Sequence, residues 1–516
     1  MQLGFVIDQS RCIGCHACTV ACKAENDVPL GSFRTWVKYT ESGQFPAVKR
    51  HFAVLRCNQC TDAPCVTICP VTALHKRPDG IVDVDPAVCI GCKGCMQACP
   101  YDALYIHPDS GTAQKCHFCA HRAERGLAPA CAIVCPTEAI IPGDFHDPES
   151  RVSRLRRNGD LAARKTEAGT GPNVYYKEAD GSGLDPMATH AAGGYLWANQ
   201  IPGVQLDADT FAAMERRAAA RTVYDVAHPP LWGDKVAAYL FTKSLAAGVF
   251  LAGAALAPPL RAAGATTAST SIAALALVFL GLTGALLVAD LKRPDRFLFI
   301  LRRPQWGSWI ARGAFVLVAY GALLALWLGL AAADAPVLAA PAGRALVGTV
   351  LLVLTMLAAA LTACYTAWLF QQSRGRVLWM QRGLALRLIA QAVVAGAAAL
   401  LLLAPLLGMG LGDVGILRRM LLAALVIHLG MTVVEPQLAP PQRAAEYARA
   451  ARLVSHGPFA RSHWIAGVML GTVAPMVLLL LSMPPLLWSM GAALALAGLF
   501  VEEEILVRAG QALPIS

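Results

Sequence analysis

The first residues of the chain lack the features of an export signal. MQLGFVIDQSRC contains no basic segment followed by an apolar one, and it has no twin-arginine pair. Disulfide bonds persist in oxidising compartments, so the missing signal weakens a disulfide interpretation of the cysteines. Charged residues are also few, at 15% of 516, whereas 56% of the residues are hydrophobic. Such a balance is unusual for a soluble protein and indicates membrane-embedded segments.

Cysteines and long apolar runs occupy different parts of the sequence. Sixteen of the 17 cysteines lie between Cys12 and Cys135, and nearly all long apolar runs come later. We therefore expect a cysteine-rich head, a polar connecting segment that packs partly on it, and a membrane-embedded tail: 1–150, 151–230 and 231–516. The connecting segment contains neither G-x-G-x-x-G nor a P-loop, so it indicates no nucleotide site. Many basic residues flank apolar spans, so the net charge of +10 is attributed to membrane topology rather than to nucleic acid.

The cysteines form four groups of one pattern: C-x2-C, a third cysteine at variable spacing, then x3-C. The groups are Cys12, Cys15, Cys18 and Cys22; Cys57, Cys60, Cys65 and Cys69; Cys89, Cys92, Cys95 and Cys99; and Cys116, Cys119, Cys131 and Cys135. A [4Fe–4S] cluster requires four thiolates around one small object. Three close cysteines wrap one side of it, and a fourth, followed by proline, reaches the neighbouring cluster. The sixteen cysteines therefore predict four [4Fe–4S] clusters as metal centres.

Other roles for these cysteines explain the pattern less well. Zinc binds paired C-x2-C motifs, but it requires neither the third cysteine nor the Cys-Pro ending of the last three groups. Cys12, Cys15 and His16 spell the C-x-x-C-H motif of covalent haem attachment. That assignment would leave Cys18 and Cys22 unexplained and would require export. We interpret His16 as a loop residue, with tuning of a cluster as the alternative role.

These stretches resemble the four-cluster iron–sulfur subunits of membrane molybdoenzymes, of the dimethyl-sulfoxide-reductase and polysulfide-reductase (DmsB/PsrB) type. The matching segments are FVIDQSRCIGCHACTVACKAEND, LRCNQCTDAPCVTICP, VDVDPAVCIGCKGCMQACPYDA and KCHFCAHRAERGLAPACAIVCPTEAI. The resemblance covers roughly residues 1–150 and implies two ferredoxin-like halves with crossed ligation. The implied ligand sets are Cys12, Cys15, Cys18 with Cys135; Cys116, Cys119, Cys131 with Cys22; Cys57, Cys60, Cys65 with Cys99; and Cys89, Cys92, Cys95 with Cys69. It also implies that the cluster of the third group lies nearest the membrane, and that a molybdopterin-containing catalytic subunit docks on the head.

Apolar spans of about 20 residues predict helices that cross a bilayer. The expected spans are 236–258, 271–290, 310–331, 345–370, 386–409, 416–435, 464–482 and 485–507. The last two share one long uncharged run, which we divide near Pro484. The expected fold class is an α+β ferredoxin-like double dicluster head fused to an all-α polytopic membrane domain of about eight transmembrane helices.

Basic residues are distributed unequally between the two ends of these spans. With eight spans, the connections and helix ends on the side of the head contain 15 Lys and Arg. The opposite side has only four: Arg261, Arg344, Arg418 and Arg419. The positive-inside rule then places the head in the cytoplasm, beneath a bacterial-type inner membrane. A periplasmic head stays open as an alternative, because related iron–sulfur subunits are exported with their catalytic partner and a basic face can also serve docking.

A second resemblance lies in LLVADLKRPDRFLFILRRPQWGSWIARGAF, residues 286–315. It is similar to the NrfD/PsrC family of quinone-interacting membrane subunits, whose corresponding stretch reads D-L-G-R-P followed by R-F. Lys292 replaces the usual glycine, and the match extends more weakly over 230–510. The chain thus resembles a fusion of two subunits that are usually separate. The resemblance implies menaquinone or ubiquinone as the redox partner in the membrane.

Polar residues at the start of the first span are the candidates for a quinone site. Tyr239 and Lys243 are four residues apart and share a helix face near the head, where either could donate a hydrogen bond to a quinone carbonyl. The alternative for Lys243 is that its amine extends to the membrane interface. His228 and Trp232 just precede the span and are further candidates.

Proton-path candidates are Asp290, His428 and Glu435. An ion pair with Arg296 is the simpler role for Asp290, and a buried pair or interface position is an equal alternative for the other two. We expect Glu502, Glu503 and Glu504 on a solvated face near the membrane surface. The tail has no obvious facing pair of histidines, so no haem is predicted there.

The sequence is interpreted as the electron-transfer and membrane-anchor subunit of a respiratory oxidoreductase. Four clusters would pass electrons between a molybdopterin catalytic subunit and the quinone pool. No group of residues suits substrate chemistry, so the quinone redox site would be the chain's only part in catalysis. One alternative is an electron-transfer and proton-translocating module of a quinol-oxidising complex with cytochrome partners. Another is a membrane scaffold whose clusters are structural.

Overall fold

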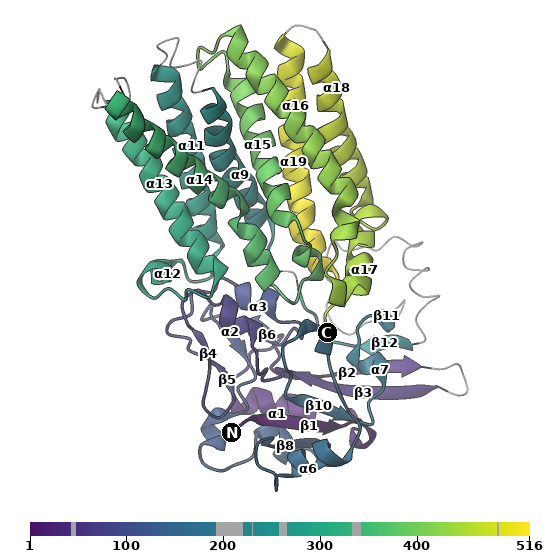
Figure 1. The fold of residues 1–516 in the computed structure, drawn as a ribbon. Coiled ribbons are helices and arrows are strands. Elements are labelled where there is room, and N and C mark those ends of the chain that lie inside the picture. Colours follow the sequence, from purple (N-terminus) through teal and green to yellow (C-terminus); the bar gives the residue numbers. More distant parts are fainter. Residues whose placement is uncertain (43–47, 192–219, 230, 257–265, 333–341, 482–484) are drawn as a thin grey trace.

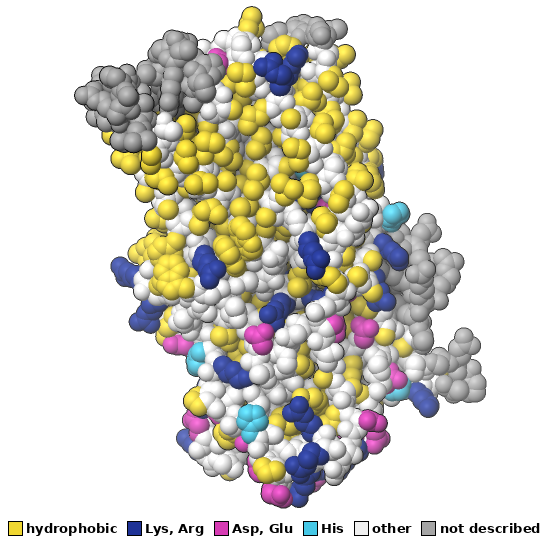
Figure 2. Space-filling view, viewed as in Figure 1, with side chains coloured by type: hydrophobic (Ala, Val, Ile, Leu, Met, Phe, Trp, Pro, Cys, Tyr) yellow, Lys and Arg dark blue, Asp and Glu magenta, His cyan; other side chains and the backbone are white. Residues whose placement is uncertain are grey.

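The structure is a computed structural model that describes residues 1–42, 48–191, 220–229, 231–256, 266–332, 342–481 and 485–516. It consists of a head of short strands and helices and a bundle of long helices that stands on it (Figure 1). Hydrophobic side chains cover much of the visible surface of the bundle, whereas Lys, Arg, Asp and Glu are more frequent over the head (Figure 2). These observations confirm the expected fold class of a ferredoxin-like head joined to an all-helical membrane domain.

Two four-stranded sheets form the outer part of the head. The first has the order β8 (Ile140–Asp144), β1 (Leu3–Asp8), β10 (Val174–Lys177), β9 (Leu161–Ala163). The second has the order β11 (Thr189–Ala191), β12 (Ala220–Tyr224), β2 (Thr35–Ser42), β3 (Lys49–Arg56). β1 pairs with β10 in parallel and with β8 in antiparallel orientation. Strands β9 to β12 come from the connecting segment 151–230, so the described part of that segment contributes to both sheets.

Short helices and hairpins surround the cysteines. The helices are α1 (Ala17–Glu25), α2 (Pro64–Ile68), α3 (Gly94–Ala98), α4 (Ala120–Ala123), α5 (Ala130–Ile133), α6 (Arg151–Asn158) and α7 (Gly181–Leu184). The hairpins are β4 (Leu74–Lys76) with β5 (Val82–Val84), and β6 (Leu104–Ile106) with β7 (Ala113–Lys115). Such short elements leave much of the head as loops, which can wrap around a compact group.

Long helices make up the bundle. They are α9 (Asp234–Ala255), α11 (Thr266–Asp290), α13 (Trp309–Ala332), α14 (Ala342–Gln372), α15 (Leu384–Leu403), α16 (Leu411–Val434), a π-helical stretch η7 (Ser462–Val473) that continues as α18 (Ala474–Leu480), and α19 (Pro485–Ala512). In the described part of the chain, seven helices are long and apolar enough to cross a membrane, whereas eight spans were expected. The span expected at 485–507 is the one outside these seven. It forms α19, which packs beside α15 and η7.

Glycine pairs allow two helix crossings in the bundle. A Cβ atom at Gly248 of α9 would lie 1.7 Å from the carbonyl oxygen of Ala392 in α15, and one at Gly396 would lie 1.9 Å from the carbonyl carbon of Gly248. A Cβ atom at Gly498 of α19 would lie 2.1 Å from the Cα atom of Gly471 in η7. Small residues at these crossings bring the helix backbones into contact, which is the usual packing of membrane helices.

Candidate functional site

Four small cavities in the head are each lined by four cysteines. The sets are Cys12, Cys15, Cys18 and Cys135; Cys22, Cys116, Cys119 and Cys131; Cys57, Cys60, Cys65 and Cys99; and Cys69, Cys89, Cys92 and Cys95. The empty space in each is about 270 to 350 Å³. The structure thus brings together the four sets that the sequence resemblance implied, including the crossing of the fourth cysteine. Ligation of iron by these cysteines remains a prediction, and this placement supports it.

The cysteines of each set surround a space instead of meeting at one point. Among the described residues, no group of three or more His, Cys, Asp or Glu side chains is close enough to hold a single metal ion. The loops turn tightly beside the thiols: His16, Lys93 and Cys119 all have left-handed backbone conformations. The backbone N–H of Ala139 donates to the sulfur of Cys135 at 3.2 Å. This arrangement fits a cubane cluster held by four thiolates.

Burial opposes ionisation of these thiols as free groups. It raises the pKa of Cys18 to about 11, and it raises the pKa of Cys92 and of Cys99 to about 12. Iron binds the thiolate, so the positive charge of bound iron would have to compensate for this cost. Two buried cations lie nearby. The guanidinium of Arg56 donates a hydrogen bond to the sulfur of Cys131 at 3.2 Å, and the amine of Lys115 donates to the backbone carbonyl of Cys116, beside the same cavity, at 2.9 Å.

The cavity of Cys69, Cys89, Cys92 and Cys95 lies against the membrane helices. Trp232, just before α9, donates a hydrogen bond from Nε1 to the carbonyl oxygen of Cys92 at 3.3 Å. Arg296 donates from Nη1 to the carbonyl oxygen of Cys89 at 3.1 Å. Apolar residues of α9, including Tyr239, pack in one continuous cluster with these cysteines. The contacts support the implied placement of the third group's cluster beside the membrane.

Asp290, at the end of α11, pairs with a residue of the head. Its Oδ2 atom lies 2.7 Å from the amine of Lys93, which is 5% exposed. We expected an ion pair between Asp290 and Arg296, and that expectation is wrong. Arg296 instead reaches the carbonyl oxygens of Pro86 and Cys89 and approaches Asp295. The carboxylate of Asp290 is thereby left to the cation in the loop between Cys92 and Cys95.

Tyr239 and Lys243 are both buried in the bundle, on neighbouring turns of α9. The amine of Lys243 donates hydrogen bonds to the carbonyl oxygen of Ala363 at 2.7 Å and to Oγ1 of Thr366 at 2.9 Å. It also lies 5.4 Å from the ring centroid of Tyr365. Lys243 therefore does not extend to the membrane interface, and its amine faces α14.

The other two quinone-site candidates lie closer to the head. The ring of His228 packs against Trp36 at 5.1 Å between centroids, and its Nδ1 atom lies 3.7 Å from the carboxylate of Asp102. Both partners are residues of the head. Trp232 stacks on Trp379, with the ring centroids 5.5 Å apart. Of these two, Trp232 lies between the membrane-side cavity and the bundle.

His428 and Glu435 are members of one buried series of charged groups. His428 Nε2 and Glu502 Oε2 are 2.7 Å apart, and Glu502 also lies 3.5 Å from the guanidinium of Arg387. Arg387 donates a second hydrogen bond to Glu435 at the head-side end of α16. The series joins α15, α16 and α19, so residues far apart in the sequence share one polar cluster.

Glu502 and Glu503 do not lie on a solvated face, so that expectation is wrong. They are 3% and 0% exposed, and Glu503 accepts a hydrogen bond from Ser244 of α9 at 2.9 Å. Sequence reasoning missed these two residues, although consecutive acids in an otherwise apolar span are a signal of function. Only Glu504 behaves as expected, with an ion pair to Arg508 at 3.0 Å near the helix end.

Several buried polar atoms in this cluster have no hydrogen-bond partner among the described residues. They are Nδ1 of His428, Oε1 of Glu502, Oε2 of Glu503, Nε of Arg387 and both terminal atoms of Gln391. Buried polar atoms are usually paired with protein or with ordered water. Their concentration between α9, α15, α16 and α19 therefore indicates bound water molecules inside the bundle.

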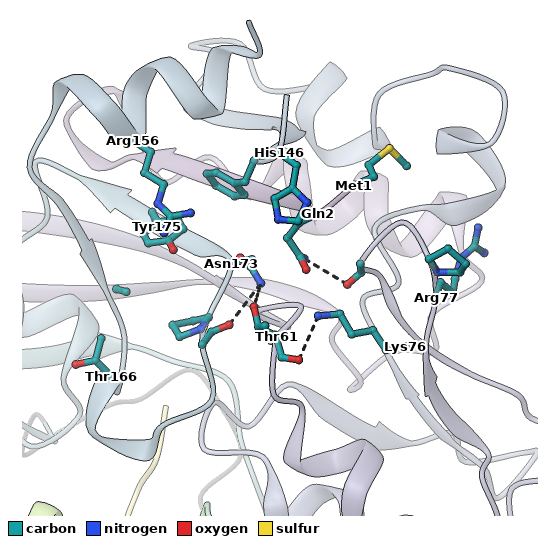
Figure 3. Close-up of a pocket in the computed structure, with 16 residues that line it drawn as sticks. Met1, Gln2, Thr61, Lys76, Arg77, His146, Arg156, Thr166, Asn173 and Tyr175 are labelled. Carbon is teal, nitrogen blue, oxygen red and sulfur yellow. Dashed lines mark hydrogen bonds between the residues drawn. The ribbon is translucent and has the colours of Figure 1, made fainter. Parts of the chain in front are cut away.

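A larger and more open cavity lies on the head, away from the membrane helices (Figure 3). Its polar side chains are mostly engaged with backbone carbonyls. The amine of Lys76 donates to the carbonyl oxygens of Cys60 and Thr61, at 3.3 and 3.2 Å, and Asn173 donates to Thr61 Oγ1 at 3.1 Å. The guanidinium of Arg156 packs over the ring of Tyr175 at 5.1 Å. These contacts describe a structural surface beside the cysteine sets, and they supply no group of residues suited to substrate chemistry.

Comparisons with known proteins agree with this division of the chain. Residues 223–514 match the family described as Polysulphide reductase, NrfD, residues 48–145 match a 4Fe-4S dicluster domain, and residues 3–24 match a 4Fe-4S binding domain. The B subunit of tetrathionate reductase from Salmonella typhimurium is 44% identical over 37% of this chain and 78% of its own length. A putative iron-sulfur subunit of dimethyl sulfoxide reductase from Halobacterium salinarum is 36% identical over 43% of this chain and 94% of its own. The corresponding polysulfide reductase component from Wolinella succinogenes is 37% identical over 34% and 93%, respectively.

Proposed function

The protein is a member of the Polysulphide reductase, NrfD family, and on that premise we propose that it carries electrons between a catalytic partner and the quinone pool. It is a multi-pass membrane protein that joins an iron–sulfur electron-transfer head to an NrfD-type tail. The observation that carries the proposal is the set of four cysteine-lined cavities, one of which contacts the membrane helices through Cys92 and Trp232. When bound, four [4Fe–4S] clusters there would accept and pass on one electron at a time.

The catalytic partner is proposed to dock where the cavity of Cys12, Cys15, Cys18 and Cys135 meets the surface. Cys15 is exposed, and Cys12 and Cys135 are partly exposed. Ile13, Val20 and Ile133 surround these cysteines and are 57%, 64% and 58% exposed. Exposed apolar residues around a redox centre favour a protein partner, because electrons can enter a cluster only from a donor in close contact. Similarity to reductase subunits favours a molybdopterin-containing reductase subunit as that partner.

A quinone is proposed to bind in the bundle near Tyr239 and Lys243. Both side chains are held by helix packing, and Tyr239 shares its apolar cluster with the membrane-side cysteines. The amine of Lys243 is a hydrogen-bond donor of the kind that a quinone carbonyl requires. Trp232 separates this region from the nearest cluster cavity, whereas His228 packs among head residues and is the weaker candidate.

Protons for quinone chemistry are proposed to pass along the buried charged cluster. Glu435 stands at the head-side end of α16, and its partner Arg387 contacts Glu502. His428 hydrogen-bonds to Glu502, and Glu503 is the next residue along α19, with Ser244 as its partner beside Lys243. Water molecules at the unpaired atoms would complete the path from the head-side surface. Reduction of a quinone consumes two electrons and two protons, so its site must connect to both a cluster and water.

We place the head in the cytoplasm, below an inner membrane. The excess of basic residues on the head side, 15 against four, supports that orientation. Part of the excess also serves docking, because Arg376 bonds to Gln97 at 2.8 Å and Arg374 to Asp62 at 2.9 Å. Those two side chains therefore weigh less in the topology argument than free flanking residues do.

The function is tested by reducing the purified protein with menaquinol and ubiquinol analogues and following the clusters by EPR. Quinol-driven signals are expected in the native protein. They are expected to disappear in Cys95→Ser, which removes the cluster nearest the membrane, although dithionite still reduces the other clusters. Cys364→Ser, in α14, is the control and leaves the signals unchanged. Clusters that respond to dithionite but to neither quinol would contradict the membrane half of the proposal, and a head without iron would contradict all of it.

A further inference from the structure

Arg56 is a fully buried cation that has no acidic partner among the described residues. It is the last residue of β3, and its side chain is 0% exposed. Its Nη1 atom donates a hydrogen bond to the sulfur of Cys131 at 3.2 Å. The Nε and Nη2 atoms have no hydrogen-bond partner in the described part of the protein. Sulfur is therefore the one acceptor that this part offers to the guanidinium.

Burial of an unpaired charge is unfavourable, so nearby negative charge must stabilise Arg56. The ring of Phe5 lies 4.4 Å from the guanidinium carbon and provides a cation–π contact, which is a partial compensation. The larger source is the cavity that Arg56 itself lines, together with Cys22, Cys116, Cys119 and Cys131. Four thiolates around a [4Fe–4S] core give a net negative charge, and that charge would be next to the guanidinium.

We propose that Arg56 is a positioning residue that raises the reduction potential of the cluster held by Cys22, Cys116, Cys119 and Cys131. The inference rests on the proposed function in that the head must hold clusters. Reduction adds one negative charge to the cluster, so a fixed cation beside it stabilises the reduced form more than the oxidised form. The effect is large because the site is buried and the local dielectric is low.

The effect of Arg56 is expected to be selective among the four clusters. The neighbouring cavity of Cys12, Cys15, Cys18 and Cys135 is lined from β3 by Val54 and does not include Arg56. A charge that favours one cluster over its neighbour sets where an electron resides along the series of clusters. The step itself is simple: the cluster beside Arg56 gains one electron, its neighbour loses one, and no bond or proton changes.

The test is an EPR-monitored redox titration of the full-length protein with its clusters. Arg56→Met removes the charge and keeps much of the volume, and Arg56→Lys keeps the charge. Arg164→Met is the matched control, because Arg164 is 1% exposed and donates only to the carbonyl oxygens of Leu184 and Ile515. In Arg56→Met, the equilibrium constant for reduction of one cluster is expected to fall about tenfold, a shift of about 59 mV for a one-electron couple. Arg56→Lys and Arg164→Met are expected to keep all four potentials close to those of the native protein.

Each result bears on the proposal. Four unchanged potentials in Arg56→Met, with full iron content, would overturn it, and so would an equal shift in Arg164→Met. If Arg56→Met fails to assemble one cluster, Arg56→Lys decides the matter. Retention of that cluster at its native potential shows that the positive charge is required, whereas its loss there too shows a geometric role and overturns the inference. Absence of iron from the native protein would instead be a failure of the proposed function.

Discussion

The indole nitrogen of Trp232 donates a hydrogen bond to the carbonyl oxygen of Cys92, with 3.3 Å between the two atoms. Trp232 precedes the first membrane helix, and Cys92 lines the cavity nearest the bundle. The same tryptophan stacks on Trp379, whose own Nε1 atom donates to the carbonyl oxygen of Leu506 in α19. Two tryptophans thus connect a cluster loop to both ends of the membrane domain's sequence, at the place where electrons must enter or leave it.

Trp232→Phe is expected to slow electron exchange between quinol and the clusters. The aromatic ring remains, but the hydrogen bond to Cys92 is lost, which costs about 1 kcal/mol and loosens the contact. We expect the quinol-driven reduction rate, measured by stopped flow, to fall by roughly fivefold, the factor that corresponds to such an energy. Trp464→Phe is the control, because its Nε1 atom also donates to a backbone carbonyl, that of Ser455, at an exposed position. Equal rates in both variants would show that the Trp232 contact is irrelevant to transfer.

Asp290→Asn is expected to weaken the junction between head and tail. The substitution leaves the amine of Lys93 buried without its counter-charge, and such a loss typically costs about 3–5 kcal/mol. A lower midpoint temperature for unfolding and slower quinol oxidation are the expected results. Asp295→Asn serves for comparison, since Asp295 is 57% exposed and its pairs with arginines are at the surface. A native-like midpoint in Asp290→Asn would mean that the pair does not stabilise the junction.

Crossed ligation makes a prediction about which cysteines share a cluster. Cys22 and Cys131 line one cavity although they come from different sequence groups, whereas Cys18 lines another. Serine at Cys22 or at Cys131 should therefore perturb the same EPR signal. Cys18→Ser should perturb a different one, and each variant should lose up to about four iron atoms. If Cys22→Ser and Cys18→Ser changed the same signal, the ligands would follow the sequence groups instead.

The cysteine sets show how far the sequence alone can lead. Spacing was sufficient to predict four clusters, because each C-x2-C run is a local motif with its own chemistry. The pairing of distant groups came from the family resemblance, and no local rule joins Cys22 to Cys131. The position of the membrane helices was also predictable, since about 20 apolar residues are a local signal.

Long-range partners were beyond the sequence. Asp290 pairs with Lys93, which lies far earlier in the sequence, and its sequence neighbour Arg296 was the more obvious choice. Burial of Glu502 and Glu503 depends on Arg387, His428 and Ser244, which come from three other helices. Consecutive acids near the end of an apolar run resemble a solvated helix end, and only tertiary packing shows that they face inward.

Glu503→Gln is expected to slow quinol turnover without affecting the clusters themselves. Glu503 is fully buried, and one of its oxygen atoms, Oε2, has no hydrogen-bond partner among the described residues. An amide keeps the size of the side chain and can still accept from Ser244, but it cannot carry a proton. Loss of one proton-transferring group typically slows a reaction on the order of 100-fold.

Two measurements separate this effect from structural damage. Dithionite reduction should give native EPR spectra in Glu503→Gln, because the clusters lie in the head, and quinol turnover should slow further in D₂O if proton delivery limits it. Glu504→Gln is the matched control: it is the adjacent acid, but it pairs with Arg508 near the helix end. Native turnover in Glu503→Gln would exclude this carboxylate from the proton path, and an equal loss in Glu504→Gln would point to a general effect of charge in α19 instead.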